Sequence, residues 1–175
     1  MSEALTAQER RHLLDGLERT AAAFVTAAEA VPADRWKPGP ESGKWSPGQI
    51  AEHLVLVEQQ LIGMLQNELL KSPAVERSPD QSELDERIPI AVLDPQRRPE
   101  APPTMRPTGR WLDRTEVLTH FRSERDRTVA YIRDTNDPLR GHRVARPGLG
   151  RLDGYHWLLL LIAHTERHTR QLQSE

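Results

Sequence analysis

The chain has 175 residues, a formal net charge of -2 at pH 7 and no cysteine. A chain of this length is expected to fold around one substantial core, and we treat residues 1–175 as a single domain. The near-neutral charge argues against nucleic acid or an anionic membrane as a partner, because both require a strongly basic face. The absence of cysteine excludes disulfides, cysteine-ligated metals and thiol nucleophiles, and it fits a reducing compartment.

No signal peptide or membrane span is expected. The N-terminus lacks a signal-peptide pattern. The longest apolar run, from Trp157 to Ala163, is too short to cross a bilayer. We therefore expect a cytoplasmic protein.

The first predicted helix covers residues 7 to 30. Thr6 and Glu9 have the spacing of a capping box, in which each side chain bonds a free backbone N–H. Apolar side chains then recur at helical spacing, and Pro32 ends the pattern. The stretch up to residue 46 is rich in proline, glycine and serine, so we predict a loop there, with Trp36 and Trp45 closing the end of the core.

The second predicted helix covers residues 47 to 70. Ser46 suits the N-cap, Pro47 the first helical position and Gln49 the third. His53 lies on the apolar stripe of this helix, between Ile50 and Val57.

The segment from Ser72 to Arg110 holds eight of the fourteen prolines and shows no helical periodicity. Only a short turn near residues 81–87 is expected within it. A compact domain rarely carries so long an irregular connection without a role. We interpret it as a crossover over the other helices, with a lid or a partner-binding arm as the alternative.

Two further helices follow, at residues 114–134 after an Asp113 cap and from an Asp153 cap to about residue 173. No strand is expected. Four long amphipathic segments without strands predict an all-α fold, a four-helix bundle.

Two histidines follow the most apolar part of the last helix. His164 and His168 are four residues apart, so they share one helix face, and they continue the inward stripe of Trp157 and Leu161. An imidazole directed into a core needs a hydrogen-bond partner or a metal ion. Taken singly, each histidine also fits a core residue with ordinary hydrogen bonds.

The depth of the histidines predicts the topology. His53 is about 10 Å from the start of its helix and His168 about 8 Å from the end of its own, at about 1.5 Å per residue. These depths match only if the second and fourth helices are antiparallel. A long crossover between the second and third helices gives that arrangement, an up-down-down-up bundle.

His53, His164 and His168 are therefore the candidate metal ligands. Three neutral imidazoles suit a borderline divalent ion and leave coordination positions for water. Three nitrogen ligands alone do not choose among zinc, nickel and iron, and we take zinc and nickel as the leading candidates. Thr165 stands where zincin metalloproteases carry their catalytic glutamate, which excludes a protease of that type.

Other polar residues are weaker candidates. His120 and His156 are expected to be partly exposed, with a place beside the metal ligands as the alternative. Glu52 and Glu58 flank His53 on the second predicted helix, and Glu58 is expected to be solvated. Three loop arginines are candidates for binding an anionic substrate, although solvated side chains are the simpler reading: Arg106, Arg110 and Arg143.

Three stretches resemble the DinB-like superfamily, the DNA-damage-inducible and YfiT-type four-helix proteins. They are WSPGQIAEHL at residues 45–54, DGYHW at 153–157 and HTERHTRQL at 164–172. The resemblance implies an up-down-down-up bundle with a three-histidine metal site at His53, His164 and His168. Relatives include metal-dependent hydrolases, thiol-dependent S-transferases and a mycothiol-dependent maleylpyruvate isomerase, so it implies a site more firmly than a reaction.

Three functions remain open. The first is a metal-dependent hydrolase or thiol-dependent S-transferase acting on a small molecule, with any low-molecular-weight thiol supplied from outside this cysteine-free chain. The second is a non-catalytic metal-binding module of a stress response. The third is a metal-free bundle with a structural role, which forms a homodimer.

Overall fold

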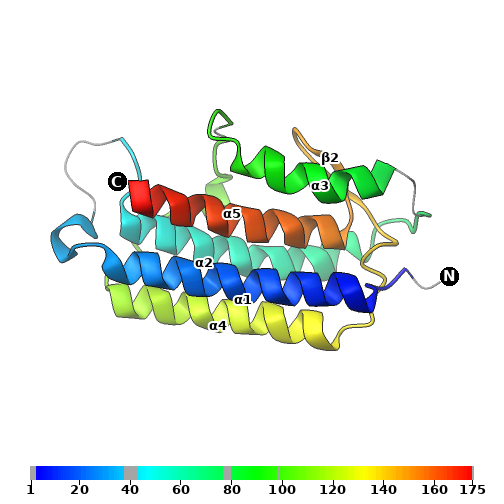
Figure 1. Ribbon diagram of the computed structural model, residues 1–175, viewed down its shortest axis with the longest axis horizontal. Helices are drawn as coiled ribbons and strands as arrows, with labels where there is room; N and C mark the ends of the chain where they lie inside the picture. Colours follow the sequence, from blue (N-terminus) through cyan, green and yellow to red (C-terminus); the bar gives the residue numbers. More distant parts are fainter. Residues whose placement is uncertain (1–2, 38–42, 77–79, 98, 175) are drawn as a thin grey trace.

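Four long helices lie side by side in the computed structural model, which describes residues 3–37, 43–76, 80–97 and 99–174 (Figure 1). They are α1 (Ala7–Ala30), α2 (Pro47–Met64), α4 (Arg114–Asp134) and α5 (Gly154–Ser174). A shorter helix, α3 (Asp80–Leu93), packs on the outside of α5 (Figure 1). The mostly helical structure confirms the predicted all-α character in its main feature.

The short elements connect these helices. A 3₁₀ turn, η1, spans Ala33–Arg35; a π-helical turn, η2, extends α2 over Leu65–Leu69; and a second 3₁₀ turn, η3, spans Pro103–Met105. Residues 38–42 of the predicted first loop lie outside the described residues. No helix in the described part of the chain is both long and apolar enough to cross a membrane.

The predicted helix starts are present. Thr6 and Glu9 exchange hydrogen bonds of 2.9 and 3.1 Å, so that the backbone N–H groups of these two residues at the start of α1 are satisfied. Ser46 and Gln49 form the same capping box at the start of α2, at 2.9 and 3.3 Å. The observed bounds of α1 and α4 agree with those predicted, whereas α2 ends as a regular α-helix earlier than expected.

The segment between α2 and α4 is less irregular than predicted, because it contains α3. Helical periodicity is weak there and Pro89 lies inside the helix, where proline is unfavourable, so the local sequence gives little signal. Tertiary contacts stabilise α3 instead: Ile88 is fully buried, and Arg167 of α5 donates to the carbonyls of Val92 and Asp94. Residues 77–79 and 98 of this segment lie outside the described residues.

A β-hairpin precedes α5, although no strand was expected. Strands β1 (Val144–Arg146) and β2 (Gly150–Leu152) pair antiparallel. Gly148 and Gly150 have φ of +78° and +93°, a region that favours glycine, and this lets the chain reverse within a few residues. The six paired residues are too few for an alternating pattern to stand out in the sequence.

Helix packing places α2 next to α5. α1 contacts α5 and α4, while α2 contacts α4 and α5. α2 and α4 both begin at the same end of the molecule, and α1 and α5 run in the opposite direction (Figure 1). Ile50 near the start of α2 accordingly shares a buried cluster with Val117 near the start of α4.

Candidate metal centre

Three imidazoles from two helices meet between α2 and α5. His164 Nε2 lies 3.3 Å from His53 Nε2 and 3.2 Å from His168 Nε2. One nitrogen from each histidine lies within 4.8 Å of the others, so the set can hold a metal ion. Two nitrogens at about 2.1 Å from a tetrahedral ion are about 3.4 Å apart, so the two spacings to His164 suit a shared ion.

Hydrogen bonds at the outer ring nitrogens fix two of the tautomers. His53 Nδ1 lies 2.7 Å from the carbonyl oxygen of Met105, which only accepts, so Nδ1 carries the proton. His168 Nδ1 donates in the same way to Gln171 Oε1 at 3.0 Å. The Nε2 atoms of both rings therefore present lone pairs to His164.

A bound cation would satisfy this arrangement better than hydrogen bonds alone. A neutral His164 with its proton on Nε2 has one N–H to share between two facing lone pairs. With its proton on Nδ1, three lone pairs converge, and Nδ1 is a buried atom with no hydrogen-bond partner among the described residues. The donor set of three imidazole nitrogens fits a borderline divalent ion such as zinc or nickel.

Burial keeps all three histidines neutral. Desolvation lowers the pKa of His53, although the Met105 carbonyl partly opposes it. Desolvation also lowers the pKa of His168 to about 3, and that of His164 falls well below its usual value. A cation can therefore bind near neutral pH without displacing protons from its ligands.

The surroundings of the centre are aromatic and cationic. Trp45 packs on His53 with ring centroids 4.8 Å apart, so this tryptophan lies beside a candidate ligand. After burial and the two other histidines, the charges of Arg167 and Arg146 also lower the pKa of His164. His53 and His168 are buried, whereas His164 is partly exposed, which gives the centre an accessible side.

Two of the weaker candidates lie in environments that the sequence did not indicate. Glu58 is buried, not solvated, because it forms an ion pair with Arg125. His156 is fully buried and not partly exposed, since it lies between Asp85 and Asp153. His120 is partly exposed, as expected.

The three candidate loop arginines have other partners. Arg106 donates to the carbonyl of Ala101 at 2.9 Å and pairs with Glu100. Arg110 lies over the ring of Trp111, and Arg143 donates to the carbonyl of Glu76. No contact to the histidines is found for these arginines in the described part of the chain.

The groups around the centre that sequence reasoning missed are the Met105 carbonyl, Gln171, Arg146 and Arg167. Gln171 lies one helical turn after His168, and this spacing is a usable signal. A backbone carbonyl has no signal of its own, because every residue type carries one.

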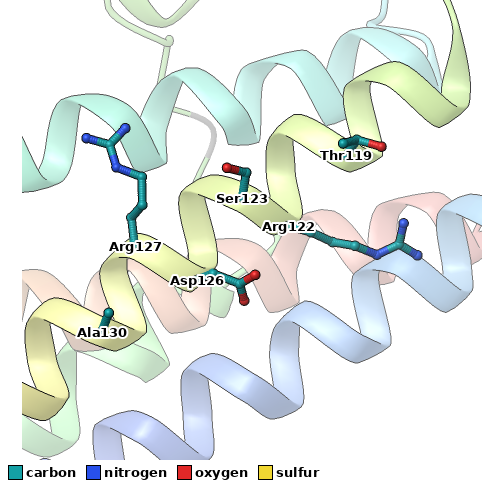
Figure 2. A pocket seen from close by; sticks show the side chains of 6 residues that line it. All are labelled: Thr119, Arg122, Ser123, Asp126, Arg127 and Ala130. Atoms are coloured by element: carbon teal, nitrogen blue, oxygen red, sulfur yellow. The ribbon is translucent and has the colours of Figure 1, made fainter.

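A hollow of about 530 Å³ lies elsewhere, on the outer face of α4. Figure 2 shows that its lining side chains project from this single helix. They are Thr119, Arg122, Ser123, Asp126, Arg127 and Ala130. None is a candidate metal ligand, so the hollow is separate from the histidine centre.

Comparison with known proteins gives one result. No match is found among curated proteins or among solved structures. A family model described as the DinB superfamily matches residues 16–172, a span that includes all three histidines of the centre. Since this match covers most of the chain, the protein belongs to the DinB superfamily.

Proposed function

We propose that this protein is a metal-dependent enzyme that holds one divalent cation through His53, His164 and His168. The observation that carries the proposal is the pair of fixed tautomers: the Met105 carbonyl and Gln171 direct two Nε2 lone pairs toward the third imidazole. Membership of the DinB superfamily is compatible with such a centre.

The reaction we propose is hydrolysis or thiol-dependent S-transfer on a small molecule. When bound, a divalent ion at three imidazoles supplies Lewis acidity, which lowers the pKa of a water or thiol and polarises a substrate. His53, His164 and His168 bind and orient that ion, and Trp45 shields the His53 side from water. Any thiol comes from a low-molecular-weight cosubstrate, because the chain has no cysteine.

The proposed architecture is one domain, an up-down-down-up four-helix bundle with α3 added to its outside. It is supported by the shared direction of α2 and α4 and by the packing of α1 and α2 against the same two helices, α4 and α5. In this arrangement α2 and α5 are antiparallel, which is what brings His53 to the depth of His164 and His168.

Metal analysis tests the proposal. Purified protein, dialysed and titrated with zinc or nickel in a calorimeter, is expected to bind about one equivalent. His164→Ala and His168→Ala are expected to lose most of the affinity, whereas His120→Ala, a histidine of α4 outside the centre, keeps it. Unchanged affinity in both ligand variants would refute the site.

A screen for turnover follows. Metal-loaded protein is incubated with small esters and amides, and with electrophiles in the presence of low-molecular-weight thiols. Turnover that is lost in His164→Ala supports the enzyme. Metal binding without any turnover would favour a non-catalytic metal-binding module, and absence of metal binding would favour a structural, dimerising bundle.

A further inference from the structure

A short segment that begins in η3 and leads toward α4 lies against His53 and Glu52 at the candidate metal centre. We call residues 104–110 the strap. At its start, Gln60 Nε2 donates to the carbonyl of Thr104 at 2.7 Å, and Thr104 Oγ1 donates to Gln60 Oε1 at 3.0 Å. The next residue, Met105, accepts from His53 Nδ1. The strap thus supplies the carbonyl that sets the tautomer of His53.

The far end of the strap is held by one carboxylate. Glu52 immediately precedes His53 on α2 and is 1% exposed. Its oxygens accept from the N–H and hydroxyl of Thr108 at 2.9 and 3.2 Å. They also accept from the N–H groups of Gly109 and Arg110, at 2.9 and 3.2 Å. Four donors from the strap therefore converge on a single buried anion.

Neutral donors compensate this charge. No ion pair of Glu52 is found in the described part of the chain, so strap N–H and hydroxyl groups provide the stabilisation that a buried carboxylate requires. Gly109 has φ +79°, which lets consecutive N–H groups point to the same anion. If the strap moved away, Glu52 would lose all four of these hydrogen bonds. The carboxylate of Glu52 therefore stabilises the strap in its observed position.

We propose that Glu52 is a positioning residue of the metal centre. By holding residues 108–110, it keeps the Met105 carbonyl against His53 Nδ1, so that His53 Nε2 faces His164. The inference rests on the proposed metal function and adds a residue that does not contact the metal itself. Coupling between two binding equilibria is reciprocal. The factor by which the strap, in its observed position, raises the affinity for metal is therefore also the factor by which bound metal stabilises that position of the strap.

The principal test compares two glutamates, Glu52 of α2 and Glu68 of η2, the turn that extends α2. Glu68 is exposed, so its charge can be removed without breaking a buried ion pair. Glu52→Gln places an amide N–H₂ against the strap N–H groups. It is expected to weaken zinc binding about tenfold, the lower end of the range for groups that orient metal-binding histidines. Glu68→Gln is expected to leave zinc affinity within about twofold of the wild type. Competition with a chelator measures both.

A second pair of variants keeps the proposal testable if Glu52→Gln does not fold. Gly109→Ala strains the backbone of the strap, because alanine rarely adopts the φ of +79° found there. The new Cβ causes no clash, since its nearest neighbour would be Leu112 Cδ2 at 3.7 Å. Gly148→Ala imposes the same strain in the hairpin turn, where φ is +78°. Gly109→Ala is expected to weaken zinc binding several-fold, and Gly148→Ala to leave it unchanged.

Hydrogen exchange gives a readout that does not depend on turnover. The amides of Gly109 and Arg110 are expected to exchange faster in Glu52→Gln than in Glu68→Gln, and zinc is expected to slow them in the wild type. Equal zinc affinity within each variant pair, in a protein that binds zinc, would overturn the role of Glu52. A wild type that binds no metal would instead overturn the proposed function, while exchange would still report whether Glu52 anchors the strap.

Discussion

Arg125 donates to both carboxylate oxygens of Glu58, at 2.8 and 2.9 Å, and the two side chains are only 3% and 1% exposed. The other guanidinium protons bond the carbonyl of Leu17 and the hydroxyls of Thr20 and Thr165. Helices α1, α2, α4 and α5 each contribute a group to this network. A buried ion pair is tolerated when every donor of the guanidinium has an acceptor, as it does here. The network also fixes the positions of the four helices relative to one another.

Removing one member of this pair is expected to be costly. Arg125→Met should lower the free energy of unfolding by about 3–5 kcal/mol, because Glu58 remains buried without its partner. The double variant Arg125→Met/Glu58→Met should recover much of this loss, since no uncompensated charge is left. Urea unfolding of the metal-free proteins measures both. A single variant that loses less than about 1 kcal/mol would indicate a solvated pair.

A second buried arginine connects α3 to the rest of the molecule. Arg140 lies 2.7 Å from a carboxylate oxygen of Glu9 and 3.0 Å from oxygens of Asp85 and Asp153. Asp85 also lies 2.8 Å from Nε2 of His156. Asp85 is the contribution of α3 to this cluster, so it secures that helix against α1 and the start of α5.

Asp85→Asn is therefore expected to loosen α3 locally. Loss of the charged hydrogen bonds should lower the free energy of opening of α3 by about 1.5–3 kcal/mol, the usual worth of such bonds. Hydrogen exchange should become faster in α3 and stay unchanged in α4. Glu83→Gln, an exposed position of the same helix, is the control. Equal exchange in the two variants would show that the cluster does not hold α3.

The four long helices were predictable because their signals are local. Pairs such as Thr6 and Glu9, or Ser46 and Gln49, mark helix starts within a few residues, and apolar periodicity marks their length. Helix α3 was not predictable in the same way. Its stability depends on remote partners such as Arg167, which is 75 positions from Val92.

In the candidate site too, local signals were predictable from the sequence and contacts between distant residues were not. The histidines could be brought together from spacing on regular helices, since four residues return to one face and depth follows from rise per residue. The buried state of Glu58 was missed because its partner, Arg125, is 67 positions away. The Met105 carbonyl was missed because the path of the strap over His53 depends on tertiary contacts, above all those of Glu52.

Arg146 is expected to attract anions to the centre. It ends β1, and no hydrogen bond or ion pair of its guanidinium is found within the described residues. Its charge contributes to the lowered pKa of His164, which burial mainly causes. Arg146→Gln should weaken azide binding to cobalt-loaded protein about fivefold, as loss of about 1 kcal/mol of partly screened attraction implies.

A titration followed by visible absorption checks this expectation. Arg151→Gln is the matched control, because Arg151 lies on the neighbouring strand and donates to the carbonyl of Arg143. Azide affinity that is the same in both variants would show that the charge of Arg146 does not act on the centre.

The final prediction concerns the stability of the metal-free protein in acid. Burial is the main cause of the lowered pKa values of His53, His164 and His168, and the pKa of His168 falls to about 3. In the unfolded chain, histidines titrate near about 6.5. Above that pH both states are neutral and the free energy of unfolding does not depend on these groups. Below it, the unfolded chain takes up protons that the native chain does not, so stability falls with falling pH.

Below pH 6.5, three such histidines together make the free energy of unfolding fall by up to about 4 kcal/mol per pH unit. This dependence continues until the pH approaches the lowered pKa values of the native state. Urea unfolding in the presence of a chelator, at several pH values between about 7.5 and 4.5, measures this slope. The variant His164→Asn/His168→Asn removes two of the three groups, so the part of the slope that comes from the centre should fall to about one third. The difference between the two proteins cancels the contribution of carboxylates that titrate in the same range. If wild type and variant lose stability in parallel below pH 6.5, the two histidines are not buried in the neutral form, and the centre described above does not persist without metal.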